Sequence, residues 1–197
     1  MKLVDTIELI SAGPFAKSAE WRTIQTDIAK AIQAVVWPPK AKKCVLYDCK
    51  GRGRGQGNGV KPIKEACMIA LHKAGWNIDE RTNPYRLDAT KKLKSGLLFG
   101  LEWETGNISS SHRAINRILL AYTKGELAGG ALIVPTRKMY SYLTDRVGNL
   151  PELEPYFDLW RAMPWKDGTL SVIAVEHDGV SKDVPRIKKG TDGRALI

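Results

Sequence analysis

The sequence predicts an α/β fold, because short apolar runs of strand character alternate along the chain with longer stretches of helical periodicity. The alternation contains no internal repeat. A length of 197 residues with 43% hydrophobic content is enough for a sizeable core and fits one domain better than two. We therefore expect residues 1–197 to form a single domain in which helices pack on a sheet.

Helices are predicted where apolar residues recur at three- and four-residue spacing. They are residues 20–36, residues 62–75, a stretch after the N-cap hydroxyls of Ser109–Ser111, a stretch around Met139–Leu143 and residues 152–163. The apolar face of the last helix, which includes Tyr156 and Trp160, belongs either to the core or to a dimer contact. Strands are predicted at residues 45–47, 97–104, 131–134 and 170–175, with 131–134 as a buried central strand.

The strand at residues 97–104 carries two acidic side chains on one face. Apolar residues alternate there with Glu102 and Glu104, which places the two glutamates about 7 Å apart along the strand. The pair indicates either a metal site or a solvated edge strand. Asp88 lies fourteen residues before Glu102, so a hairpin or crossover can bring a third carboxylate beside the pair. Three converging carboxylates repel unless a cation such as Mg²⁺ or Mn²⁺ neutralises them, and this arrangement suits phosphodiester hydrolysis.

The charge of the chain favours nucleic acid as a partner. Thirty-one Lys and Arg against twenty-one Asp and Glu leave a net charge of +10. A membrane is not expected, because no apolar run reaches the roughly 18 residues of a spanning helix. The odd set of Cys44, Cys49 and Cys67 without a signal peptide indicates a reduced, cytoplasmic protein, and its spacing does not predict structural zinc.

Three polar segments are candidates for DNA contact, and each also has a plainer explanation. Asn107, Ser109 and Arg113 at a helix start either cap the helix or face base edges in the major groove. Asp145 and Arg146 form either an ion pair at a helix end or a pair that reads guanine and cytosine. The glycine-rich segment 50–59 is either a mobile surface loop or a loop that touches phosphates.

Several blocks of sequence resemble the BamHI family of type II restriction endonucleases. They are Leu101–Ser110, Tyr142–Val147, Glu152–Phe157, Asn58–Val60 with Pro62–Glu65, and Val184–Pro185 with Lys189–Gly193. The blocks occur in the family's order over residues 58–193. The resemblance implies a PD-(D/E)xK fold, in which a central mixed β-sheet is flanked by helices and the site lies at one sheet edge.

The resemblance also implies an activity. A member of this family is a homodimeric bacterial enzyme of a restriction–modification system, which binds double-stranded DNA. It cleaves the palindrome GGATCC after the first G on each strand and leaves four-base 5′ overhangs. The implied cofactor is Mg²⁺, with Mn²⁺ or Ca²⁺ as substitutes in binding, and no small-molecule cofactor is implied. The competing class is a non-catalytic, sequence-specific DNA-binding protein, which would leave the acidic residues without a role.

The family's catalytic pattern maps onto acidic residues of this sequence. By resemblance, Asp88, Glu102 and the backbone carbonyl of Trp103 hold the metal. Glu104 stands where related nucleases have a lysine and is the implied general base or water-positioning residue. A further acid precedes the aspartate in the family; Asp79 aligns best with it, and Glu80 lies one residue away.

The recognition pattern maps onto residues of the three polar segments and beyond. It comprises Asn107, Ser109, Arg113, Asp145 and Arg146 as base-contacting side chains, Lys64 as a lysine near the bases, and Asp192 and Gly193 in a minor-groove segment. Lys64 can also be explained as a solvated lysine of a helix. The sequence departs from BamHI after Gly193, where BamHI continues into a further helix, so minor-groove contacts are expected to differ. Charges at the family's dimer contact are also changed, around Thr123, Lys124 and Arg161.

Overall fold

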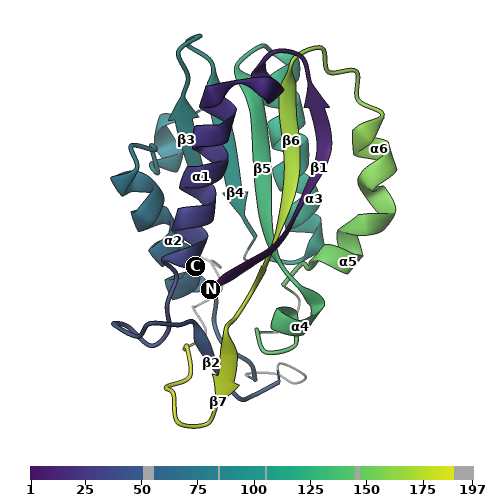
Figure 1. The fold of residues 1–197 in the computed structure, drawn as a ribbon. Coiled ribbons are helices and arrows are strands. Elements are labelled where there is room, and N and C mark those ends of the chain that lie inside the picture. Colours follow the sequence, from purple (N-terminus) through teal and green to yellow (C-terminus); the bar gives the residue numbers. More distant parts are fainter. Residues whose placement is uncertain (51–55, 84, 105, 145–146, 189–197) are drawn as a thin grey trace, which may run out of the picture.

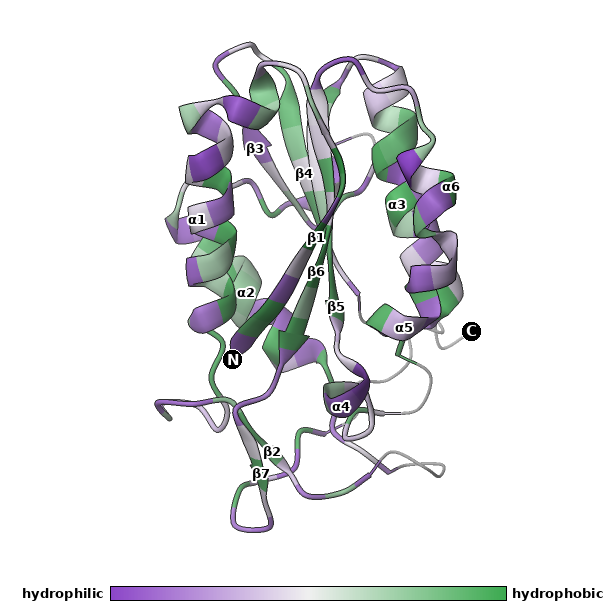
Figure 2. Cartoon of the chain, turned by 45° about the vertical axis from the view of Figure 1, so that its right-hand side comes forward, coloured by the Kyte–Doolittle hydropathy of each residue, from purple (hydrophilic) through white to green (hydrophobic). Residues whose placement is uncertain are grey.

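A computed structural model describes residues 1–50, 56–83, 85–104, 106–144 and 147–188 of the chain. Its main feature is a five-stranded sheet with the strand order β1-β6-β5-β4-β3. Helices cover both faces of this sheet, as Figures 1 and 2 show: α1 (Ala19–Gln33) and α2 (Lys61–Lys73) on one face, and α3 (Ile108–Thr123), α5 (Leu150–Leu153) and α6 (Phe157–Arg161) on the other. The predicted central mixed sheet flanked by helices is therefore confirmed.

The sheet is mixed because a parallel centre is extended by an antiparallel strand on each side. β4 (Leu98–Trp103), β5 (Leu127–Pro135) and β6 (Gly168–Glu176) run parallel, and β5 lies in the middle of the sheet, as predicted. All nine residues of β5 are buried, which explains its uniformly apolar sequence. β3 (Ala89–Lys92) pairs with β4 in an antiparallel hairpin.

One long strand has no clear signal in the sequence. β1 (Lys2–Ala12) pairs antiparallel with β6, and its register shifts between Leu3 and Asp5 and again between Glu8 and Ile10. Each shift moves the following side chains to the other face, so the alternation of apolar and polar residues is interrupted.

Two apolar layers hold the helices against the sheet. On one face Ile24, Ile28 and Ile32 of α1 are almost completely buried. On the other face Ile115 and Ile118 of α3 are fully buried. Figure 2 shows the apolar stripes of these helices turned inward and their polar sides turned outward. Burial of each such side chain contributes about 1.5–3 kcal/mol to folding, so both layers fix helix positions relative to strand ends.

The helix predicted over residues 152–163 is wrong as a continuous element. The chain instead forms α5, a 3₁₀ turn at Glu154–Tyr156 and α6. Pro155 has no backbone N–H to donate and interrupts the α-helical hydrogen-bond ladder. The helix predicted around residues 139–143 is also shorter than expected, as α4 (Arg137–Tyr140).

A small second sheet lies below the main sheet in Figure 1, near α4. It consists of β2 (Val45–Tyr47) and β7 (Gly179–Ser181), which run parallel. Two further 3₁₀ turns cover Phe15–Lys17 and Glu80–Thr82. Among the helices of the described residues, none is long and apolar enough to cross a membrane.

Candidate active site

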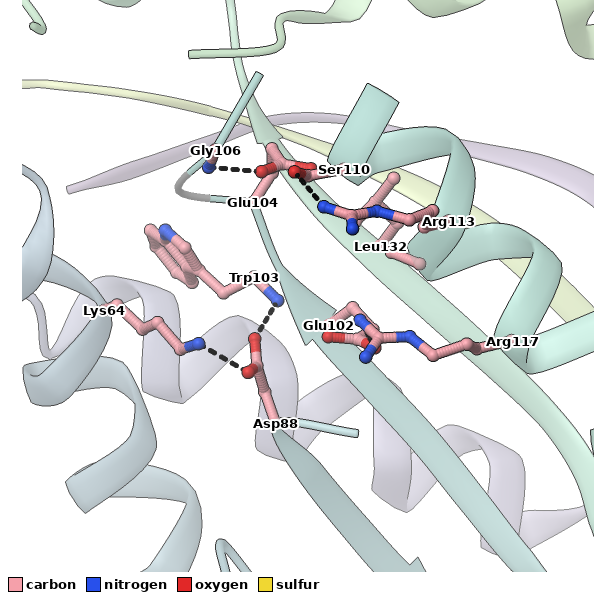
Figure 3. Close-up of a pocket in the computed structure, with 11 residues that line it drawn as sticks. Lys64, Asp88, Glu102, Trp103, Glu104, Gly106, Ser110, Arg113, Arg117 and Leu132 are labelled. Carbon is pink, nitrogen blue, oxygen red and sulfur yellow. Dashed lines mark hydrogen bonds and ion pairs between the residues drawn. The ribbon is translucent and has the colours of Figure 1, made fainter. Parts of the chain in front are cut away.

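A cavity of about 210 Å³ opens at the carboxyl end of β4. Three acidic residues line it, Asp88, Glu102 and Glu104, and basic side chains reach it from helices on both faces of the sheet. Figure 3 shows Lys64 of α2 on one side, and Arg113 and Arg117 of α3 on the other. The structure thus brings together the three carboxylates that the sequence pattern singles out.

The β3–β4 hairpin places Asp88 beside the two glutamates. Ala89 pairs with Leu101, so Asp88, the residue just before β3, lies next to the end of β4. The Oδ2 atom of Asp88 accepts a hydrogen bond from the backbone N–H of Trp103 at 2.7 Å. This bond fixes the carboxylate against the strand that carries Glu102. The hairpin that the sequence offered as one of two possibilities is confirmed.

Both glutamates are buried, which excludes a solvated edge strand. β4 lies between β5 and β3, and Glu102 and Glu104 are only 4% and 5% exposed. The N–H of Glu104 donates to the carbonyl oxygen of Ile133 at 2.9 Å, so the strand pairing continues past the end of β4. The Oε1 atom of Glu104 accepts a hydrogen bond from the N–H of Gly106. The contact with Ile133 therefore fixes the backbone of Glu104, and the contact with Gly106 orients its carboxylate.

Two cationic side chains balance the buried acids. The Lys64 ammonium forms an ion pair with Asp88, and the Arg117 guanidinium forms one with Glu102 at 2.6 Å. Buried carboxylates require such partners, because their desolvation costs several kcal/mol per ion. Arg117 is not among the site residues predicted from the sequence. It lies four residues after Arg113, on the same side of α3, and this spacing was an available signal.

The donor set of the cavity fits a divalent cation, although the described residues contain no group of three or more His, Cys, Asp or Glu side chains arranged to hold a metal ion. Lys64 and Arg117 contact the carboxylates of Asp88 and Glu102 in this arrangement. Mg²⁺ prefers oxygen ligands and is commonly held by one or two carboxylates together with a substrate phosphate. Asp88 and Glu102 supply two such carboxylates in one cavity, so the residues present fit Mg²⁺.

The start of α3 presents the predicted recognition side chains to solvent. Asn107, Ser109 and Arg113 are all exposed. Asn107 is also the N-cap of α3 and accepts a hydrogen bond from the N–H of Ser110 at 3.2 Å, which corrects the expectation that Ser109–Ser111 cap the helix. Arg113 donates to the Ser110 hydroxyl at 2.9 Å, beside the cavity. Asn107 therefore caps α3 and is at the same time exposed, so its capping role does not exclude a contact with DNA bases.

The structure does not bring Asp79 to the acidic cavity. Asp79 caps the 3₁₀ turn at Glu80–Thr82 and forms an ion pair with Arg81 at 3.1 Å. Hydrogen bonds from the side chain and backbone of Arg81 lower the pKa of Asp79 below its usual value. The remaining predicted site residues, Asp145, Arg146, Asp192 and Gly193, lie outside the described residues.

The buried cysteines are not activated. Cys44 and Cys67 are free thiols in the core. Burial, with a smaller contribution from the nearby Asp88 carboxylate, raises the pKa of Cys67 to about 12. Burial likewise raises the pKa of Cys44 to about 11. Both side chains are therefore neutral packing groups at physiological pH.

The fold matches that of a known nuclease. The restriction endonuclease BglII, solved in complex with a DNA 16-mer, superposes with a TM-score of 0.61 at 10% sequence identity, over 98% of this chain and 91% of that chain. This likeness shows that the chain has a restriction endonuclease-like fold, and three buried carboxylates gather where its strand β4 ends.

Sequence comparison identifies the family. Residues 1–194 match the family described as restriction endonuclease BamHI, and the chain belongs to this family. It is 48% identical to the type II restriction enzyme OkrAI of Oceanobacter kriegii over 179 residues, which cover 88% of this chain and 89% of OkrAI. It is 32% identical to the type II restriction enzyme BamHI of Bacillus amyloliquefaciens, over 85% of this chain and 80% of BamHI. The protein is accordingly a type II restriction endonuclease, a site-specific deoxyribonuclease.

Proposed function

We propose that the protein is a Mg²⁺-dependent homodimer that cleaves double-stranded DNA at GGATCC, after the first G of each strand. The observation that carries the catalytic part is the convergence of Asp88, Glu102 and Glu104 in one cavity of a restriction endonuclease fold. The specificity and the dimer are supported by the resemblance to BamHI and by the retained residue types at the predicted recognition positions. A palindromic site is matched by two protomers related by a two-fold axis.

Asp88, Glu102 and the carbonyl oxygen of Trp103 are the proposed ligands of Mg²⁺. When bound, the metal supplies Lewis-acid activation of the scissile phosphate and neutralises negative charge near the leaving oxygen. Glu104 is proposed to orient a water molecule and accept its proton, because its carboxylate lines the same cavity and is held by Gly106. Arg117 reaches the cavity from α3, where its positive charge favours a phosphate group.

Recognition is proposed to occupy the surface next to this cavity. The exposed N-terminal end of α3 offers Asn107, Ser109 and Arg113 to the major groove, where Asn suits adenine and Arg suits guanine. By resemblance, Asp145 and Arg146 contact cytosine and guanine, Lys64 lies near the bases, and the segment with Asp192 and Gly193 matches a minor-groove segment. Lys64 also forms an ion pair with Asp88, so the proposed base-proximal lysine contacts a carboxylate of the acidic cavity.

The proposal is tested on plasmids that carry one GGATCC, one site with a single base pair changed, or no related site. The purified protein is incubated with each plasmid in Mg²⁺ and in EDTA, and the DNA ends are sequenced. Cleavage only of the first plasmid, only with metal and after the first G on both strands, is the expected result. Cleavage at another palindrome would overturn the recognition residues and keep the catalytic ones. Tight specific binding without cleavage would favour a non-catalytic DNA-binding protein.

A further inference from the structure

The end of the glycine-rich segment is a buried junction and not a surface loop. Gly57, Asn58 and Gly59 are all buried, and the Asn58 side chain is 0% exposed. The expectation of a mobile loop is therefore wrong for these three residues, while residues 51–55 lie outside the described residues. None of the three residues lines the acidic cavity. They nevertheless connect several parts of the chain that lead toward it.

The Asn58 side chain uses its full hydrogen-bonding capacity on backbone groups. Its Nδ2 atom donates to the carbonyl oxygens of Tyr47 and Tyr142, at 2.9 Å each. Its Oδ1 atom accepts from the N–H groups of Tyr47 at 3.2 Å and Ile187 at 3.4 Å. A carboxamide has two donor hydrogens and two acceptor lone pairs, so these contacts satisfy it completely. No other side chain of this size supplies the same two donors and two acceptors.

The main chain of Asn58 adds two hydrogen bonds to the segment before Asp145. Its N–H donates to the carbonyl oxygen of Tyr142 at 2.7 Å, and its carbonyl oxygen accepts from the N–H of Thr144 at 2.8 Å. Asn58 and Leu143 accordingly form an isolated parallel bridge. Residues 142–144 are thus attached to Asn58 by both side-chain and backbone contacts. The next two residues in the chain are Asp145 and Arg146.

The flanking glycines allow backbones to pack without side chains between them. A Cβ atom on Gly57 would lie 2.2 Å from the carbonyl oxygen of Leu143, and Gly57 has a φ of +79°. A Cβ atom on Gly59 would lie 2.2 Å from the carbonyl oxygen of Lys188. The N–H of Gly59 also donates to the carbonyl oxygen of Ile187 at 2.9 Å. These positions require glycine because of close backbone approach.

The junction joins the catalytic side of the protein to its predicted recognition segments. α2 begins at Lys61, just after Gly59, and one turn later Lys64 pairs with Asp88. Along the chain, residues 142–144 are followed by Asp145 and Arg146, and residues 187–188 lie a few residues before Asp192. A single buried tripeptide therefore sets where α2 begins relative to residues 142–144 and 187–188.

We propose that Asn58 is a positioning residue for sequence discrimination, which holds the chain before Asp145 in register with the helix that carries Lys64. The inference rests on the proposed DNA-cleaving function and deepens it. Misplacement of a positioned group by about 1 Å costs on the order of 10²-fold in rate. Cleavage of the correct site depends on recognition contacts that a changed site lacks, so a small shift at this junction slows cleavage of the correct site more. Asn58 acts through the segments that it holds and does not touch DNA.

The test is Asn58→Asp, which keeps the size and the acceptor atom but replaces Nδ2 by an oxygen that faces two carbonyl oxygens. The readout is the ratio of single-turnover cleavage rates at the site that the wild-type protein cuts and at the same site with one base pair changed. We expect this ratio to fall by at least about 10-fold. The control is Ile32→Ala, which removes fully buried side-chain volume in α1 and lowers the melting temperature but leaves every hydrogen-bonding group of the junction in place.

A second pair of variants decides the question if Asn58→Asp does not fold. Gly57→Ala pushes a methyl group against Leu143, while Gly125→Ala has a similar φ of +72° and nothing within 4 Å of the new Cβ. A reduced ratio in Gly57→Ala but not in Gly125→Ala supports the proposal. An unchanged ratio in folded Asn58→Asp, or equal ratios in the two alanine variants, overturns it. Absence of site-specific cleavage by the wild-type protein would instead refute the proposed function, so the two failures are distinguishable.

Discussion

Removal of the Arg117 charge tests whether cationic side chains stabilise the acidic cavity. Arg117→Met keeps the apolar stem and deletes the guanidinium that lies 2.6 Å from Glu102. Breaking a buried ion pair costs about 3–5 kcal/mol, but the Arg117 side chain is 40% exposed, so solvent screening reduces the expected loss to about 2 kcal/mol. For a chain of this length, 1 kcal/mol corresponds to about 2–4 °C, so the melting temperature should fall by about 4–8 °C.

The assay measures thermal unfolding by circular dichroism, once in EDTA and once in Ca²⁺. Ca²⁺ is used instead of Mg²⁺ as the bound cation. A cation held by Glu102 would replace the missing charge, and at 100-fold excess over its dissociation constant it would stabilise the protein by about 2.7 kcal/mol. The melting temperature of Arg117→Met should therefore rise more with Ca²⁺ than that of the wild-type protein. The control is Arg161→Met, since Arg161 pairs with the exposed Asp158 and its loss should cost less than about 1 kcal/mol. Equal melting temperatures for Arg117→Met and the wild type in EDTA, with equal responses to Ca²⁺, would refute this reasoning.

Three further predictions concern catalysis, recognition and thiol chemistry. Glu104→Gln keeps an acceptor for the Gly106 N–H but cannot take a proton from water, so cleavage should be lost while specific binding in a gel-shift assay persists. Arg146→Ala should cost about 1–3 kcal/mol in binding and relax one G·C position, whereas equal losses on all sequences would mark a phosphate contact. Cys67 should resist iodoacetamide in the native protein at pH 8, because burial raises its pKa to about 12, whereas the half-buried Cys49 should be alkylated; peptide mass spectrometry measures both.

The sequence predicts the strands that carry the site because their patterns are local. The alternation in β4 predicts a strand, and the uniformly apolar β5 predicts a buried one, but the burial of β4 does not follow from its residues, which also suit a solvated edge strand. The hairpin that brings Asp88 to β4 is only one of two connections that the sequence allows. Its choice depends on the pairing of Ala89 with Leu101, which a local pattern does not reveal.

The partners of the acidic residues are harder to predict, because they come from distant elements. Lys64 and Arg117 reach the cavity from helices on opposite faces of the sheet, and only tertiary packing brings them to Asp88 and Glu102. The same applies to Asn58, whose sequence context of alternating glycines is typical of a surface loop. Its partners lie 11, 84 and 129 residues away, so its burial follows only from the assembled fold.

The most direct test of the proposed active site compares Asp88→Asn with Asp79→Asn in single-turnover cleavage of a duplex that contains the preferred site. Asp88 lies in the acidic cavity, whereas Asp79 is only partly buried, lies outside the cavity lining and pairs with Arg81, although the resemblance implies an acid at both positions. We predict that Asp88→Asn slows cleavage by at least roughly 10²- to 10³-fold with specific binding retained, and that Asp79→Asn cleaves at nearly the wild-type rate. Unchanged cleavage by Asp88→Asn would contradict the assignment of this cavity as the active site.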